Sequence, residues 1–99
     1  MSYNNPYQGG RSDTAHEYLM QYSVQSGKFT GKIHARSPRN AAKDAILQCA
    51  NINILLGEAI AVEINGTTLY FTTTTLIAAL QDEGHKVTAK AFGLSENDD

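Results

Sequence analysis

The chain has 99 residues, of which 41% are hydrophobic and 18% are charged, and its formal net charge is −2. This length and composition are typical of one folded domain with a single core, and they exclude a disordered chain. No apolar run approaches the roughly 20 residues that cross a bilayer. The first ten residues are polar and do not match a secretory signal. Because a single cysteine, Cys49, excludes an internal disulfide, we expect a cytoplasmic protein.

Residues 1–14 form the most polar part of the chain. They are dominated by Asn, Gly, Gln and Ser and have no apolar period. This composition predicts a flexible N-terminal arm. The sequence therefore divides into this arm, one α+β domain over residues 15–92 and a frayed acidic tail over residues 93–99.

A first hairpin is predicted between residues 17 and 36. Residues 17–24 alternate between apolar and polar side chains, which is the period of a half-buried strand. Ser26 and Gly27 predict a two-residue turn. The returning strand, residues 28–36, places an apolar set on one face: Phe29, Gly31, Ile33 and Ala35. Its other face carries Lys28, Thr30, Lys32, His34 and Arg36.

A helix is predicted to begin at Pro38. Ser37 is a favourable N-cap, and proline fits the first helical position because its missing N–H is not needed there. Residues 52–56 either extend the apolar stripe of this helix or form an apolar connection, and Gly57 is a stop signal. The stripe consists of Ala42, Ala45, Ile46, Cys49 and Ala50.

The second hairpin has the strongest local signal. Asn65 and Gly66 suit a type I′ turn, which needs positive φ at both central residues. The strand before this turn, residues 59–64, directs Ile60, Val62 and Ile64 to one face. The strand after it directs Leu69 and Phe71 inward and Thr68, Tyr70 and Thr72 outward.

A second helix is predicted over residues 75–83, ended by Gly84. A last alternation over residues 87–91 is compatible with a fifth strand. The order is then ββαββα, an α+β fold in which a four-stranded sheet carries both helices on one face, because this arrangement buries every apolar stripe.

The sequence has no pattern for catalysis, for a metal or for a cofactor. The three histidines, His16, His34 and His85, lack partners at metal-ligand spacing. Cys49 lies on the predicted buried stripe, where a thiol is inert packing. Asn65-Gly66-Thr67 matches a glycosylation sequon, but we interpret it as a turn. We therefore expect a binding module, not an enzyme, and no small-molecule substrate.

The charge distribution is asymmetric, and it defines the candidate site. Five of the eight Lys and Arg residues lie between residues 28 and 43, and five of the ten acids lie between residues 82 and 99. The outer face of the sheet and its basic end are the predicted partner-binding surface. Its candidate residues are Lys28, Lys32, His34, Arg36, Arg39, Lys43 and Tyr70.

Three interpretations of this surface remain open. Small residues, threonines and a tyrosine make a flat face that a protein partner or a second copy of the chain can approach, and edge strands allow β-addition. The basic residues could instead neutralise phosphates of a nucleic acid while Tyr70 stacks a base. However, sheet-type RNA readers use two or three aromatics and this face has one. The third interpretation is an ordinary solvated face. The sequence favours a protein partner.

Residues 17–84 resemble, in order and size, small accessory proteins of phages and mobile elements, including some anti-CRISPR inhibitors. The shared features are a strand, a helix capped by Ser37-Pro38 and rich in alanine, and a hairpin with an Asn65-Gly66 turn. This resemblance implies a non-catalytic inhibitor that covers a surface of a larger complex. It rests on organisation, and fold order does not fix function.

Overall fold

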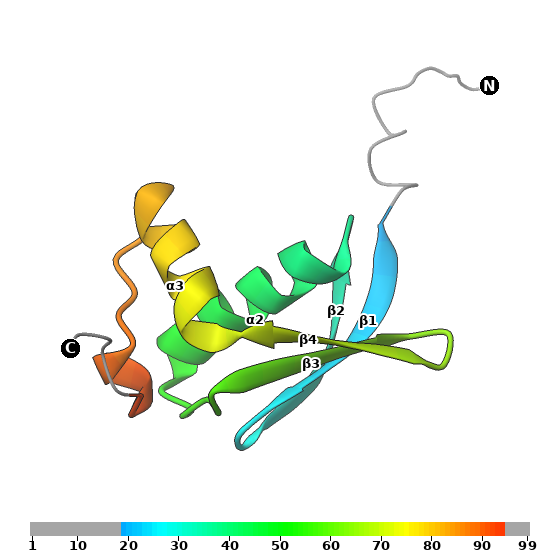
Figure 1. Cartoon of the computed structure of the whole chain (residues 1–99), viewed down its shortest axis with the longest axis horizontal. Helices are drawn as coiled ribbons and strands as arrows, with labels where there is room; N and C mark the ends of the chain where they lie inside the picture. The colour runs from blue at the N-terminus through cyan, green and yellow to red at the C-terminus, as the bar shows by residue number, and fades with distance from the viewer. Residues whose placement is uncertain (1–18, 95–99) are drawn as a thin grey trace.

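The computed structural model describes residues 19–94 and has the ββαββα order that the sequence predicts (Figure 1). The predicted arm, residues 1–14, lies outside the described residues. The elements are β1 (Met20–Ser26), β2 (Phe29–Ala35), α2 (Pro38–Ile52), β3 (Ala59–Ile64), β4 (Thr67–Thr72), α3 (Thr73–Asp82) and a 3₁₀ turn, η1 (Lys90–Phe92).

The four strands form one antiparallel sheet in the order β2-β1-β3-β4. Strands β2 and β4 are therefore its edges. Both helices lie on one side of the sheet (Figure 1), so each strand has a helix-facing side and an open side. Because successive residues of a strand point to opposite faces, the predicted inward sets of β1 and β3 lie on the helix side, with Val24 paired to Val62.

The turn of the first hairpin lies one residue later than predicted. Ser26 pairs with Phe29, so the two turn residues are Gly27 and Lys28, not Ser26 and Gly27. Gly27 has a φ of 56°, which suits the first central position of a type II′ turn. The prediction failed because Ser26 is buried by contacts with a distant segment, which local sequence does not reveal.

Helix α2 begins as predicted. The Ser37 side chain accepts a hydrogen bond of 3.1 Å from the Asn40 amide, and Pro38 occupies the first turn. The predicted stripe was wrong at one position, since Ala50 is exposed and Ala41 is buried in its place. The helix also ends earlier than Gly57, because Asn53 adopts the left-handed conformation with a φ of 58°.

The second hairpin confirms the predicted turn. Asn65 and Gly66 have φ values of 53° and 83°, so both central residues have the positive φ of a type I′ turn. Ile60 and Val62 are fully buried on the helix side. Leu69 points to the helix side as predicted, but the helix layer does not cover it, because it lies on the edge strand.

The last part of the chain corrects two predictions. Helix α3 begins at Thr73, two residues before the predicted start, and the Thr72 side chain makes no capping bond. No fifth strand forms within residues 19–94, because residues 87–91 run into η1 instead. Val87 and Ala89 of the predicted alternation are buried in the core, but Ala91 is exposed. Of the predicted frayed tail, residues 93 and 94 are described and Leu94 packs against that core, whereas residues 95–99 lie outside the described residues.

The core lies between the sheet and the two helices. Ile46 of α2, Ile60 of β3 and Leu76 and Leu80 of α3 are at most 2% exposed. Burying a side chain of this size contributes about 1.5–3 kcal/mol to folding. The sheet and both helices therefore depend on one shared core.

A polar cluster at Gly57 joins three separate parts of the chain. The Ser26 hydroxyl accepts a bond of 3.0 Å from the Gly57 amide and donates one of 2.7 Å to the Ala59 carbonyl. The Thr73 hydroxyl donates a bond of 2.7 Å to the Gly57 carbonyl. A Cβ at Gly27 would lie 2.7 Å from the Gly57 nitrogen, so the two backbones can meet only with glycine there. We call these residues the Gly57 cluster.

Replacing Thr73 by valine tests the Gly57 cluster. The substitution keeps the shape of the buried side chain but removes the hydroxyl, which leaves the Gly57 carbonyl without its 2.7 Å donor. We expect a loss of about 1–3 kcal/mol in the free energy of unfolding, measured by urea titration. Thr75→Val is the matched control, since Thr75 is exposed on the same helix. Equal stability of the two variants would contradict the role of the cluster.

Candidate functional site

The open side of the sheet is a polar surface built from two rows of side chains. The strand register places Lys32, Ser23, Glu63 and Thr68 in one row across β2, β1, β3 and β4. The next row consists of Thr30, Gln25, Ala61 and Tyr70. We call these two rows the open face. Its charges are one Lys and one Glu, so it is close to neutral.

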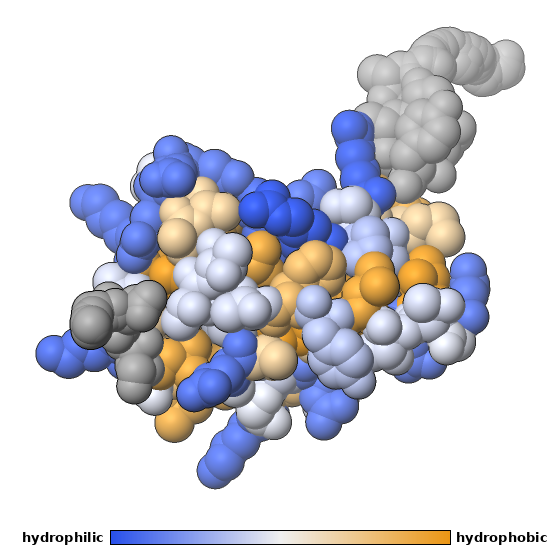
Figure 2. Space-filling model, in the orientation of Figure 1, coloured by the Kyte–Doolittle hydropathy of each residue, from blue (hydrophilic) through white to orange (hydrophobic). Residues whose placement is uncertain are grey.

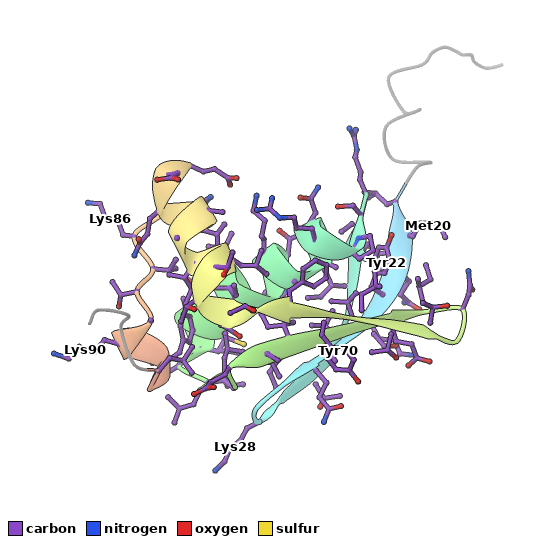
Figure 3. All side chains as sticks on the ribbon, in the orientation of Figure 1. Met20, Tyr22, Lys28, Tyr70, Lys86 and Lys90 are labelled. Atoms are coloured by element: carbon purple, nitrogen blue, oxygen red, sulfur yellow. The ribbon has the colours of Figure 1, made fainter. Side chains whose placement is uncertain are left out.

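Tyr70 is the dominant side chain of the open face. It is 72% exposed and lies opposite Ala61 on the neighbouring strand. Figure 3 shows Tyr70 on the side of the sheet away from the helices, whereas Tyr22 points into the helix layer. Since Ala61 and Ser23 are small, the sheet is hollowed beside Tyr70, and this hollow measures about 230 Å³.

The hollow has the properties of a contact surface. Ligand pockets are usually about 300–1,000 Å³ and largely apolar. This hollow is smaller, and polar side chains such as Gln25, Glu63 and Thr68 contribute to its lining. It suits the insertion of one side chain from a partner better than the enclosure of a small molecule.

The predicted basic residues are divided between two layers. Lys32 and His34 stand on the open side of β2, Lys28 lies in the turn before this strand and Arg36 follows its end. Lys28 and Arg36 are eight residues apart, which is about 27 Å along a strand. These residues form a basic edge along β2, distant from Tyr70 on the opposite edge strand.

Arg39 and Lys43 lie on α2, in the helix layer and not on the open side of the sheet. The Lys43 ammonium is 2.5 Å from the Glu83 carboxylate at the end of α3, and its side chain is only 12% exposed. The Lys43 charge therefore joins the two helices. The structure therefore lines up Lys28, Lys32, His34 and Arg36 along one strand but carries Arg39 and Lys43 into the helix layer.

The ion pair between the helices changes the pKa of Glu83. The hydrogen bond from Lys43 lowers the pKa of the Glu83 carboxyl below its ordinary value of 4.5, and the charges of His85 and Arg39 act in the same direction. Arg39 therefore also directs its field toward the end of α3. Of the two basic residues near the start of α2, Lys43 is the one that contacts α3.

The described residues carry no arrangement suited to a metal. No group of three or more His, Cys, Asp or Glu side chains comes together within residues 19–94, and His16 lies outside them. Cys49 is fully buried on α2, and this burial raises the pKa of its thiol. A thiol with a raised pKa is a poor nucleophile at neutral pH.

None of the helices within residues 19–94 has the length and apolar character needed to span a membrane.

Sequence reasoning missed an apolar surface on the helix side of the sheet. Leu69 is 43% exposed, Met20 is also exposed, and Ile64 is half-buried near the same hairpin tip. Figure 1 shows that the β3–β4 hairpin reaches past the ends of both helices, so neither helix covers these side chains. The resulting apolar surface is visible as orange and tan atoms in Figure 2. The shortness of α3 was the signal that could have predicted it.

Comparison with protein-family models, with curated proteins and with solved structures finds no match to this chain.

The Lys43–Glu83 ion pair predicts a pH-dependent stability. Because the folded state lowers the pKa of Glu83, the pair contributes fully above the ordinary value of 4.5, and this contribution is lost as the pH falls through the lowered pKa. We therefore expect Glu83→Gln to lower the thermal unfolding midpoint slightly at neutral pH and not at all in strong acid. Thermal melts at a series of pH values measure this difference.

Asp82→Asn is the control for this experiment. Asp82 is exposed on the same turn and takes no part in the ion pair that joins the helices of the described chain. If the two variants lose stability equally at neutral pH, the effect is one of general charge and the specific pair has no role.

Proposed function

We propose that this protein is a non-catalytic binding module whose open face docks on a protein partner. The observation that carries this proposal is the exposed Tyr70 beside a hollow floored by small residues. Tyrosine supplies a large contact area and a hydrogen-bonding hydroxyl at little cost in conformational entropy, which is why it is enriched in binding hot spots.

The chemistry around Tyr70 supports a protein partner. Ala61 and Ser23 allow a partner's backbone or side chain to come close to the sheet, while Gln25, Thr30 and Thr68 can make hydrogen bonds at the rim. A polar rim around a small central anchor is the usual anatomy of a protein interface. Glu63 adds one negative charge, so a partner with a basic side chain at this point would complement the face.

Nucleic acid is the second candidate partner, favoured by the basic edge along β2. Lys28, Lys32 and Arg36 are exposed, and a phosphate backbone could follow them. Two features weaken this candidate. Glu63 lies in the same row as Lys32, and Tyr70 is the single exposed aromatic of the open face. An inhibitor of a larger complex would use the open face in the same way as any other protein-binding module.

Ala61→Arg is the substitution that tests the open face. The new side chain would fill the hollow beside Tyr70 and add a charge, so we expect at least about a tenfold loss of partner affinity. Tagged protein is used to capture partners from a lysate of the source cells, with and without nuclease. Ala78→Arg is the matched control, because Ala78 is exposed on α3 on the other side of the sheet.

The outcome separates the candidates. Capture of the same protein by the wild type and by Ala78→Arg, its loss with Ala61→Arg, and its persistence after nuclease are the expected results. Loss of all capture after nuclease would favour nucleic acid. Undiminished capture by a folded Ala61→Arg variant would contradict the proposal, and circular dichroism establishes that the variant is folded.

A further inference from the structure

The outer edge of β4 presents backbone groups without partners among the described residues. A type I′ turn closes with a hydrogen bond between Ile64 and Thr67, and hydrogen-bonded pairs then alternate along an antiparallel ladder. The Thr73 amide donates a bond of 2.9 Å to the Glu58 carbonyl. This pair belongs to the same alternating set of hydrogen-bonded pairs as Ile64 and Thr67. The N–H and C=O groups of Thr68 and Tyr70 therefore point away from β3, toward the open edge.

This edge lacks the features that usually prevent strand pairing. Native edges are blunted by charged side chains, by proline or by a β-bulge. Strand β4 reads Thr-Thr-Leu-Tyr-Phe-Thr, with neither a charge nor a proline, and its register with β3 continues without a bulge from Thr67 to Thr72. The opposite edge strand, β2, carries Lys32 and is bounded by Lys28 and Arg36. The two edge strands of the sheet therefore differ in charge, since β2 carries a basic side chain and β4 carries no charged side chain.

We propose that β4 pairs antiparallel with β4 of a second copy of this chain, with the two Leu69 residues facing each other at the two-fold axis. The interface is isologous, as a two-fold dimer requires. Thr68 of each copy then lies opposite Tyr70 of the other. The two four-stranded sheets join into one continuous sheet.

The register follows from which backbone groups are available. Pairing Thr68 with Tyr70 satisfies the outward N–H and C=O of both residues in both copies. A register shifted to place Tyr70 opposite Tyr70 would instead pair Thr68 with Thr72, whose position at the N-cap of α3 gives its carbonyl to the helix. In the proposed register Thr72 faces Gly66, which has no side chain to obstruct the start of α3.

Side chains on both faces suit this pairing. Leu69 is 43% exposed on the helix side, and in the dimer it buries against its copy, since directly opposed side chains have Cβ atoms about 4.5–5.5 Å apart. Figure 2 shows apolar atoms along the helix side of this edge, above the position that Figure 3 labels Tyr70. A dimer therefore removes exposed apolar surface that the single chain leaves in water.

Charge does not oppose a second copy at this edge. The nearest charged side chain of the sheet is Glu63, and the two Glu63 residues would be separated by three strand spacings, about 14 Å. That separation exceeds the Debye length of about 8 Å at physiological salt. Self-pairing through β2, by contrast, would bring Lys32 close to its own copy.

The size of the interface sets the expected affinity. Strand β4 has six residues, about 20 Å of backbone, and such an edge buries less than the about 1,200 Å² that stable complexes bury. We therefore expect a reversible dimer in the micromolar range.

The dimer also extends the proposed function. The two open faces become one surface, with the two Tyr70 side chains on a diagonal about 7–8 Å apart at its centre. This consequence, unlike the pairing itself, rests on the open face being the partner-binding surface. A partner that engages both tyrosines would bind the dimer more tightly than the single chain.

Charge substitutions at Leu69 test the pairing directly. Sedimentation equilibrium of the wild type is expected to show a mass that rises from one chain toward two through the micromolar range. Leu69→Lys and Leu69→Glu should each remain at the mass of one chain, because like charges would meet at the axis. An equimolar mixture of the two variants should recover the mass of two chains and lose it at high salt.

One further variant is a control and another is a second test of the pairing. Ala78→Lys adds the same charge on exposed α3 and should dimerise like the wild type. Tyr70→Pro removes an outward N–H while leaving the hydrogen bonds between β4 and β3, so it should also abolish the dimer. Circular dichroism checks that each variant is folded.

Three results would overturn the proposal: a wild type of single-chain mass at every concentration, unchanged dimerisation of Leu69→Lys, or failure of the mixture to recover the dimer. The test is independent of the open-face partner, because a monomeric Leu69→Lys that still captures this partner would separate the two proposals. An Ala61→Arg variant that still dimerises but no longer captures the partner would show that the partner surface is distinct from the dimer edge.

Discussion

The close contact between Gly27 and Gly57 is the constraint on which the arrangement of the sheet depends. It brings the turn of the first hairpin against the segment that enters β3, so that β1 can pair with β3. The buried hydroxyls of Ser26 and Thr73 satisfy the polar groups of that segment. A buried amide or carbonyl without a partner costs about 1–3 kcal/mol, so glycines and hydroxyls are needed together. Helix α3 is tied to the same point through Thr73.

This constraint determines which surfaces remain uncovered. With β1 beside β3, strand β4 becomes an edge, and α3 starts directly from its last residue. The helix layer then covers most of β1, β2 and β3 but leaves the end of the sheet near the β3–β4 turn uncovered, where Leu69 and Met20 are exposed. Two surfaces result, the open face around Tyr70 and the edge of β4. They share one strand, so a partner on the first and a second copy on the other would be neighbours.

The sequence predicted those elements whose signals are local. The Asn65-Gly66 turn and the Ser37-Pro38 helix start were confirmed because each depends on the backbone preferences of two adjacent residues. A turn containing Gly27 was predicted, but its exact position and the role of Gly57 were not predictable, since they depend on contact between segments about 30 residues apart in the chain. The alternation over residues 87–91 predicted the burial of Val87 and Ala89 but not the exposure of Ala91, and the predicted strand was wrong because this segment runs into η1.

The candidate site could be predicted only in part, for a similar reason. Tyr70 and Lys32 were assigned to the open side from strand alternation, and the structure places them there. Lys43 was grouped with them from its position in the sequence, but a helix carries it to the layer on the other side of the sheet, where it meets Glu83. The exposed edge at Leu69 depends on the order of the strands in the sheet and on how much of β4 the helix α3 covers, and a local sequence pattern predicts neither of them.

Amide hydrogen exchange along β4, resolved by residue, tests the central claim that this strand is an unoccupied edge which a second copy fills. At low micromolar concentration the amides of Leu69 and Phe71, bonded to β3, should exchange slowly, while those of Thr68 and Tyr70 should exchange rapidly. At high micromolar concentration, Thr68 and Tyr70 should become protected. Exchange of these two amides that is the same at both concentrations, whether fast or slow, would contradict the account.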